Sequence, residues 1–305
     1  MTTNHGIKPA YMDKSVSPGV DFNRFANGSW IDNTEIPAKY PRWGAFLMLR
    51  DQTLEQTRVI LEELATRSET FAPGSIEQKV NDFFASGMDE AAIEAAGISP
   101  IKGELARINT IRSLRRLGDV IAHLHTVGVG GAFAFGASPD ADDSSQMIGH
   151  ALQSGIGLPD RDYYLNPDAR FAKIREAYVA HIQRMLGFAG VTGADAAQRA
   201  QDILALETRL AKPQWERAKL RDRDKTYNVV SFAELQQNYP GFDWSAWLAA
   251  NQMPKPDRVN VVTPDAVQPV LDVVDATPLP TWQDYLRFHA IDGNADLLSR
   301  QIDEA

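Results

Sequence analysis

The 305-residue sequence contains no cysteine. This absence excludes disulfide bonds, a thiolate nucleophile and any zinc site built from cysteine side chains. It does not identify the compartment, because a chain without cysteine is compatible with both oxidising and reducing surroundings.

Basic charge and long apolar runs are also scarce. The chain has 31 lysines and arginines against 40 aspartates and glutamates, a formal net charge of −9. This balance argues against nucleic acid or an anionic membrane as the main partner. No stretch approaches the about 18 consecutive apolar residues of a membrane-spanning helix. Residues 1–16 lack the apolar core of a signal peptide, so we expect a cytoplasmic protein if Met1 is the true start, and a periplasmic or secreted one if a signal peptide was removed.

The common catalytic motifs are missing as well. The sequence has no H-E-x-x-H, no nucleophile elbow, no Walker loop and no dinucleotide fingerprint. His123 and His125 would point to different faces of a helix. His289 follows Tyr285 and Phe288 on an amphipathic segment, where a packed histidine is more typical than a metal ligand. We therefore expect no metal site and no catalytic residue in this chain itself.

The patterns that are present predict a mainly α fold with one small antiparallel β-hairpin. Apolar residues recur at three- and four-residue spacing through most of residues 49–305. The clearest of these segments predict helices at about 100–117 and 169–188. The hairpin is expected at about 132–152, with a turn at 139–142.

Residues 1–48 are expected to form an extended arm with turns, one of them at Asn27-Gly28. The same Asn27-Gly28-Ser29 triplet also matches a glycosylation acceptor, although the turn is the stronger interpretation. Several aromatic residues lie between the chain-breaking residues of this arm. They can be ordered only if they bury against another body.

Two segments alternate in charge. In LPDRDYYL (158–165), Arg161 is flanked by Asp160 and Asp162, which we expect to be its ion-pair partners; acid–base work by these paired carboxylates is the alternative. In RDRDKTYN (221–228), a charge network is the expected role.

The segment PRWGAF places Arg42 between Pro41 and Trp43. A guanidinium offers a planar fork suited to a carboxylate. Pro41 restricts the backbone before it, and Gly44 is expected to permit a sharp turn after it. Both a ligand-binding role and a structural ion pair are open for Arg42.

Several segments in order resemble the N-terminal part of neprilysin-type zinc metallopeptidases, a family that includes the endothelin-converting enzymes and the PepO peptidases. These segments are SPGVDFNRFANGSWI (17–31), IPAKYPRWGAFLMLRDQ (36–52), GLPDRDYYL (157–165), RDRDKTYN (221–228) and WQDYLRFHAI (282–291).

The resemblance implies two largely helical lobes around a cavity that admits small peptides. It assigns zinc and the catalytic base to a C-terminal lobe whose motifs are absent here. Residues 1–48 would pack on that catalytic lobe, and residues 49–305 would form a helical lobe that is incomplete at its C-terminal end. Zinc would then be bound by the missing C-terminal part, present in the same protein or in a partner chain, and this chain alone would be inactive.

The resemblance also implies substrate-binding residues. Arg42 would meet the free C-terminal carboxylate of a peptide, Phe46 would line the main side-chain pocket, and Arg50 would lie near the same site. Leu47 departs from the family, which often has a polar residue at this position, and puts the subsite preference in doubt. A non-catalytic helical peptide-binding module is the alternative function.

Overall fold

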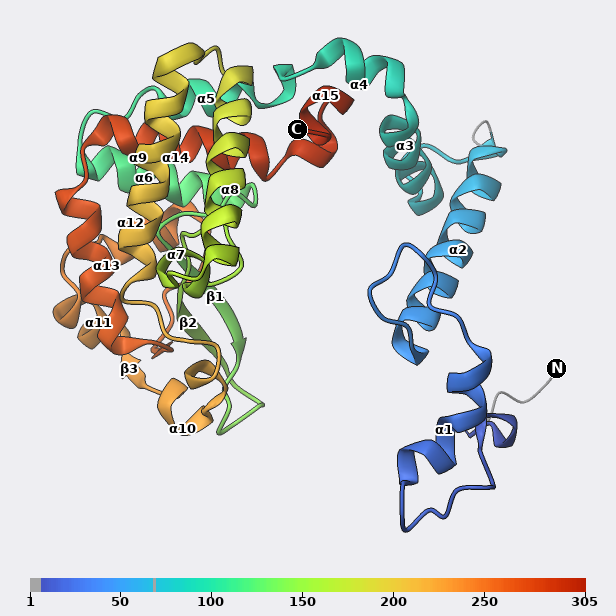
Figure 1. Ribbon diagram of the computed structural model, residues 1–305. Coiled ribbons are helices and arrows are strands. Elements are labelled where there is room, and N and C mark those ends of the chain that lie inside the picture. Colours follow the sequence, from blue (N-terminus) through green and yellow to red (C-terminus); the bar gives the residue numbers. More distant parts are fainter. Residues whose placement is uncertain (1–6, 68–69) are drawn as a thin grey trace. The chain divides into compact units, whose positions relative to one another are not determined.

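The computed structural model describes residues 7–67 and 70–305 (Figure 1). The chain divides into two compact units, one ending at Met88 and one running from Asp89 to Ala305. Helices dominate both units, which confirms the predicted mainly α class.

The first unit contains the short 3₁₀ helix η1 (Pro9–Tyr11) and the helices α1 (Phe22–Asn33), α2 (Ala45–Ala65) and α3 (Ile76–Met88). Helix α1 lies where the sequence predicted an extended arm. Its start is fixed by Asp21, whose side chain accepts a hydrogen bond from the backbone N–H of Arg24 at 2.8 Å. The predicted packing of residues 1–48 on a catalytic lobe remains a prediction.

The predicted turn at Asn27-Gly28 is wrong, because both residues lie inside α1. Gly28 is needed there for close packing. A Cβ atom at this position would lie 2.6 Å from the Cβ of Asp13. The turn that contains Asp13 is held against α1 by a hydrogen bond from Ser29 Oγ to the carbonyl oxygen of Met12 at 2.8 Å.

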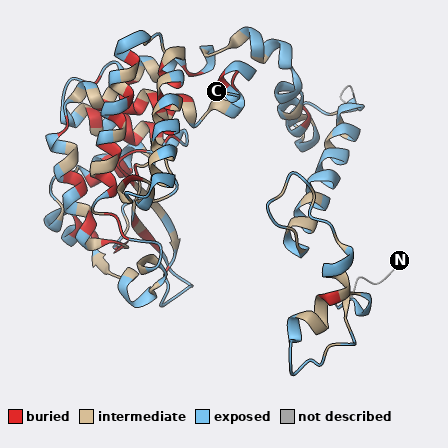
Figure 2. Cartoon of the chain, viewed as in Figure 1, coloured by how far each residue is buried: buried red, intermediate tan, exposed pale blue. Residues whose placement is uncertain are grey.

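The first unit buries little apolar surface. Among its described residues, only Gly28 and Asn81 are buried, and no residue of α2 is (Figure 2). Large apolar side chains on α2 and α3 are exposed, including Phe46 and Phe83. The helices of this unit are therefore set by local capping and by α2–α3 packing rather than by a core.

The second unit is a helical body with a small sheet. Its helices are α4 (Glu90–Ala96), α5 (Lys102–Ile108), α6 (Leu114–Thr126), α7 (Asp162–Leu165), α8 (Ala169–Phe188), α9 (Gly193–Ala211), α10 (Arg223–Thr226), α11 (Phe232–Asn238), α12 (Trp244–Ala250), α13 (Pro264–Ala276), α14 (Leu279–Asp292) and α15 (Arg300–Asp303). The predicted helix at 169–188 is confirmed as α8. The predicted helix at 100–117 is divided into α5 and α6, because Ser113 caps a new helix by accepting a hydrogen bond from the backbone N–H of Arg116.

The sheet has the strand order β1 (Phe133–Pro139), β2 (Met147–Gln153), β4 (Arg258–Val261) and β3 (Val229–Ser231). Strands β1 and β2 pair antiparallel with Phe133 opposite Gln153, which confirms the predicted hairpin. Strand β2 pairs parallel with β4, and β3 pairs antiparallel with β4. Strands of three and four residues are too short to show a two-residue period, so the sequence did not reveal β3 and β4.

Helix α14 runs through the core of the second unit. Trp282, Tyr285 and Phe288 of this helix have no exposed surface. They pack with the long helices α8 and α9, and Figure 2 shows buried positions along the helices of this unit. This packed body holds the polar clusters and cavities described below in fixed positions.

Candidate functional site

Residues 37–51 hold Arg42 in a fixed setting. The rings of Tyr40 and Trp43 stack at 5.1 Å with planes 27° apart. The hydroxyl of Tyr40 donates to Asp51 on α2, and Nζ of Lys39 lies 3.0 Å from the same carboxylate. In the sequence, Arg42 lies between these two residues, in a segment that is tied back to the second turn of α2.

The carboxylate of Asp51 is stabilised in its charged form. The hydrogen bond from Tyr40, followed by that from Lys39, lowers the pKa of Asp51 below its ordinary value. Asp51 therefore stays ionised and pairs with Lys39 rather than with either neighbouring arginine.

The sharp turn predicted at Gly44 is wrong. Gly44 has φ 174° and ψ 177°, an extended backbone that any residue adopts. It is the N-cap of α2 and provides no side-chain cap, and the first turn of α2 has no acidic residue. Within the described part of the chain, no side chain accepts a hydrogen bond from the first backbone N–H groups of α2, and the helix dipole favours an anion at this end.

Arg42, Phe46 and Arg50 follow one another at four-residue spacing across this helix start. Phe46 is 90% exposed, and both arginines are exposed. Within the described residues 7–67 and 70–305, neither arginine has an ion-pair or side-chain hydrogen-bond partner. The structural ion pair left open for Arg42 is thus not found in this part of the chain, and the substrate-binding role of the three residues stays a prediction.

The corner at 158–165 is an ion-pair site, but with partners other than those predicted. Nη1 of Arg161 lies 3.0 Å from Oε1 of Glu216, and Asp160 pairs with Arg217 at 3.0 Å. Asp162 instead donates its backbone N–H to the Asp160 side chain at 2.9 Å. The side chains of Asp160 and Arg161 point away from each other. Each therefore forms its ion pair with a residue that follows α9.

The segment 221–228 combines a local ion pair with a tether to the hairpin. Lys225 pairs with Asp222 at 2.5 Å. The hydroxyl of Tyr227 donates to Oδ1 of Asp140 at 2.6 Å, and Nη1 of Arg258 lies 2.9 Å from Oδ2 of Asp140. The hydrogen bond from Tyr227 lowers the pKa of Asp140, and the same bond raises the pKa of Tyr227 to about 12. The predicted charge network is therefore present, and its centre is a buried aspartate that the sequence did not identify.

A second polar cluster surrounds Glu207 on α9, whose side chain has no exposed surface. The hydroxyls of Tyr164 and Tyr178 donate to Oε2 at 2.6 and 2.9 Å, and Nε2 of His289 lies 2.8 Å from Oε1. The backbone N–H of Gly157 lies 3.4 Å from Oε2. Burial raises the pKa of both tyrosines, so both remain protonated donors. The cluster is closed and fully paired, which suits a structural role, and His289 is packed as predicted.

The two histidines of α6 are also packed on different sides, as predicted. Nε2 of His123 lies 2.8 Å from Oε2 of Glu104, and Nδ1 of His125 accepts a hydrogen bond from the indole N–H of Trp247 at 3.0 Å. Burial lowers the pKa of His125 to about 4. His125 is therefore neutral at neutral pH and can accept this hydrogen bond.

In residues 7–67 and 70–305, no group of three or more histidine, aspartate or glutamate side chains is placed to hold a metal ion. The described side chains therefore do not fit a zinc site. The same part of the chain contains no helix with the length and apolar character needed to cross a bilayer.

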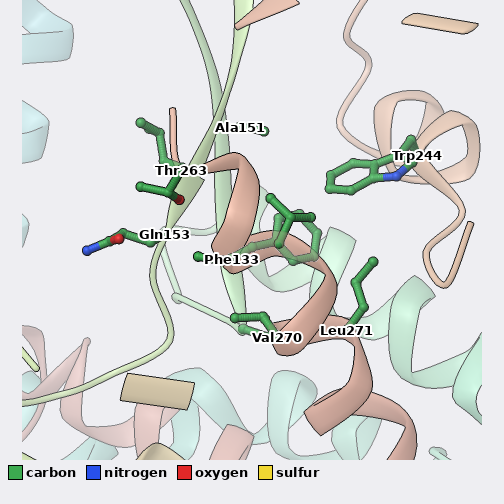
Figure 3. A pocket seen from close by; sticks show the side chains of 11 residues that line it. Phe133, Ala151, Gln153, Trp244, Thr263, Val270 and Leu271 are labelled. Carbon is green, nitrogen blue, oxygen red and sulfur yellow. The ribbon is translucent and has the colours of Figure 1, made fainter. Parts of the chain in front are cut away.

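A small apolar cavity lies between the sheet and α13 (Figure 3). Phe133 and Trp244 supply rings to its wall, and Val270 and Leu271 come from α13. No titratable side chain lines it. This cavity is thus part of the core and not a catalytic site.

Comparison with known proteins places the chain in one group. The sequence model of Peptidase family M13 matches residues 18–305. Endothelin-converting enzyme 1 of Cavia porcellus is 29% identical over 314 residues, which cover 96% of this chain and 40% of that protein. Endothelin-converting enzyme-like 1 of Mus musculus is also 29% identical, over 316 residues.

Solved structures agree with the sequence comparison. The inhibitor complex of the Mycobacterium tuberculosis zinc metalloprotease Zmp1 superposes with a TM-score of 0.84 at 34% identity, covering 98% of this chain and 45% of that one. PepO from Lactobacillus rhamnosis shares the fold, with a TM-score of 0.73 at 20% identity. The chain thus spans less than half the length of these relatives, and the shared part is their N-terminal portion.

Proposed function

The chain belongs to peptidase family M13, and on this premise we propose that it forms the N-terminal portion of a zinc metalloendopeptidase that hydrolyses small peptides. Its part in the reaction is to supply a wall of the substrate cavity and the anchor for the substrate's C-terminus. The observation that supports this role is the setting of Arg42, an exposed side chain in the segment fixed by the stacked Tyr40 and Trp43 rings, two residues before the N-cap of α2.

A guanidinium in this setting suits a peptide carboxylate. The planar fork of Arg42 donates two parallel hydrogen bonds to the two carboxylate oxygens. The free N–H groups at the start of α2 add a favourable electrostatic field. Because Asp51 is occupied by Tyr40 and Lys39, it does not compete for Arg42.

Phe46 and Arg50 extend the proposed site along α2. One helical turn places Phe46 and Arg50 on the same face, about 6 Å apart along the axis. Phe46 would contact an apolar substrate side chain, and Arg50 would add positive charge near the carboxylate. Leu47 stands next to Phe46 and makes this surface more apolar.

Zinc and the base that activates water would come from a part of the protein outside these 305 residues. Zinc supplies a Lewis acid and an activated water in metallopeptidases. The described residues offer no ligand set for it, so the 305-residue chain alone is expected to bind no zinc and to hydrolyse nothing.

Arg42→Gln in the zinc-containing full-length protein tests the anchor. Peptides with a free C-terminal carboxylate are expected to lose about tenfold to a hundredfold in kcat/KM, since a hydrogen bond to a charged group contributes about 1.5–3 kcal/mol. C-terminally amidated versions of the same peptides should change little. Arg58→Gln is the matched control, because Arg58 is an exposed arginine on α2, the helix that follows Arg42, and is paired with Glu55 and Glu62. Equal losses on free and amidated peptides would contradict the anchor.

A second test measures zinc content and peptide hydrolysis for the 305-residue chain, alone and combined with the remaining portion. It asks whether zinc and the catalytic base come from that other portion. Activity only in the combination supports the proposal. Peptide binding without hydrolysis in both cases would favour the non-catalytic module, and zinc-dependent hydrolysis by the chain alone would contradict the proposed division.

A further inference from the structure

A cavity of about 300 Å³ opens in the second unit between α6, the start of α12 and the end of α13. Its floor is apolar and buried, formed by Leu117, Ile121, Phe133 and Trp247. Phe242 adds a further ring, 4.5 Å from that of Phe133 at an angle of 75°. This volume lies at the lower end of the range for small-molecule pockets, and its lining of apolar and aromatic side chains is typical of them.

Gly118 keeps one wall of this cavity open. It lies inside α6, where glycine is less stable than alanine. Its φ is not positive, and a Cβ atom there would meet only Cε2 of Phe242, at an ordinary 3.9 Å. Neither the backbone conformation nor close packing requires a glycine at this position. The effect of the missing side chain is to leave space above the apolar floor of the cavity.

The rim of the cavity is negatively charged. Asp119, Asp243 and Asp275 line it together with one cation, Arg115. Asp243 is fixed at the rim, since its Oδ1 accepts a hydrogen bond from the backbone N–H of Ala246 at 2.9 Å. Asp119 has a long contact of 3.7 Å with Arg116.

Two further features add to the negative potential. Asp275 lies in the last turn of α13, where the helix dipole is already negative and no basic residue compensates it. His125, which is bonded to Trp247 at the floor, has a pKa lowered to about 4 by burial and adds no positive charge. The cavity therefore combines an aromatic floor with an excess of carboxylates at its entrance.

We propose that this cavity binds a small organic cation, a protonated amine carried on an aromatic or branched apolar body. The apolar body would occupy the space over Gly118, and the ammonium group would lie among the rim carboxylates and near the aromatic rings, both of which attract a cation. Three carboxylates would repel an anion of the same size. A bare metal ion would have no ligands at the floor, where the side chains are apolar. None of the residues that line this cavity belongs to the proposed peptide anchor, whose residues are in the first unit.

Binding of three probes with the same phenylethyl body to the 305-residue chain tests the charge requirement. The probes are protonated 2-phenylethylamine, neutral 2-phenylethanol and anionic 3-phenylpropionate. Their binding is measured by calorimetry and by the shift of the indole ¹⁵N–¹H signal of Trp247. The signal is assigned by its loss in Trp247→Phe. The amine is expected to shift this signal and to bind at least about fivefold more tightly than the alcohol, with the anion weaker still. Raising the salt concentration should weaken the binding of the amine but not that of the alcohol.

Variants test the location. Asp119→Asn and Asp275→Asn should each weaken amine binding about threefold or more, and Arg115→Gln should strengthen it. Asp272→Asn is the matched control, because Asp272 is exposed on α13 one turn earlier and does not line the cavity. Gly118→Leu should abolish binding by filling the space, while circular dichroism confirms that the fold is kept.

Three results would overturn the proposal. One is equal affinity for the amine and the alcohol, which would mean an apolar cavity without selection for charge. Another is undiminished amine binding in a folded Gly118→Leu variant, which would place the ligand elsewhere. The third is the absence of any shift of the Trp247 signal at tens of millimolar amine.

Discussion

Nε2 of His289 lies 2.8 Å from Oε1 of Glu207 in the interior of the second unit. The two residues are 82 positions apart and come from α14 and α9. Through the same carboxylate, Tyr164 of α7 and Tyr178 of α8 are tied to this pair. Glu207 therefore joins four helices at one point of the core.

Truncating Glu207 should destabilise the second unit strongly. Glu207→Ala would leave two tyrosine hydroxyls and a histidine without their buried acceptor, and we expect a loss of about 3–5 kcal/mol in the free energy of unfolding. Glu207→Gln keeps the shape and one acceptor and should lose less. Urea unfolding measures both, with Glu216→Gln as an exposed control expected to cost under about 1 kcal/mol. A Glu207→Ala cost as small as that of the control would show that the cluster does not stabilise the fold.

Gly157→Ala should also destabilise the protein, through a steric clash. A Cβ atom at Gly157 would lie 2.0 Å from the hydroxyl oxygen of Tyr178. We expect a loss of about 1–3 kcal/mol in unfolding free energy. In a Tyr178→Phe background the additional loss should be smaller, because the clashing oxygen is gone. The same loss in both backgrounds would locate the effect in the backbone instead.

Lowering the pH should reduce the free energy of unfolding, because His125 is held neutral in the folded protein. Its folded-state pKa of about 4 lies below the ordinary value of 6.5, so the unfolded state binds more protons between these two values. The stability contributed by neutral His125 is complete above pH 6.5 and is lost as the pH falls toward 4, by at most about 3 kcal/mol.

Comparing the unfolding free energies of the wild type and His125→Gln at pH 7.5 and pH 4.5 isolates the contribution of His125. The wild type should lose more unfolding free energy over the interval than the variant. His181 acts in the opposite direction, since its hydrogen bond to Asp292 raises its pKa, and it is present in both proteins. Parallel pH curves for the two proteins would contradict the assignment to His125.

Phe46→Ala should leave the stability of the 305-residue chain within about 0.5 kcal/mol of wild type, because this side chain is 90% exposed. Phe288→Ala, at a position without exposed surface, should cost about 3–5 kcal/mol and calibrates the assay. In the full-length protein, Phe46→Ala should lower kcat/KM for peptides with a large apolar side chain more than for peptides with a small one. A uniform loss across side chains would count against a role of Phe46 in substrate selection.

Local sequence features predicted much of the second unit. The apolar period at 169–188 defined α8, and the hairpin at about 132–152 was visible because its strands are seven residues long. The ordered motifs also indicated the peptidase family, and the resemblance to that family implied the proposed anchor at Arg42. These features are encoded in neighbouring residues, so they can be read without knowing the fold.

Two local signals were misleading, and at one of them a close packing contact overrode the local preference. Asn27-Gly28 is typical of a turn, but the turn containing Asp13 packs so closely on α1 that glycine is needed within the helix. Gly44 is typical of a sharp bend, yet it is extended at the helix start.

The sequence by itself determined the helical class and the hairpin, because apolar period and turn residues are local properties. Its ordered motifs indicated the family, and the roles of Arg42, Phe46 and Arg50 follow from that resemblance and stay a proposal. Only the tertiary structure decided that Arg161 pairs with Glu216, that Glu207 meets His289, and that Gly118 opens a cavity with an acidic rim. These relationships join residues far apart in the chain. Their partners are selected by how helices pack, which no local pattern specifies.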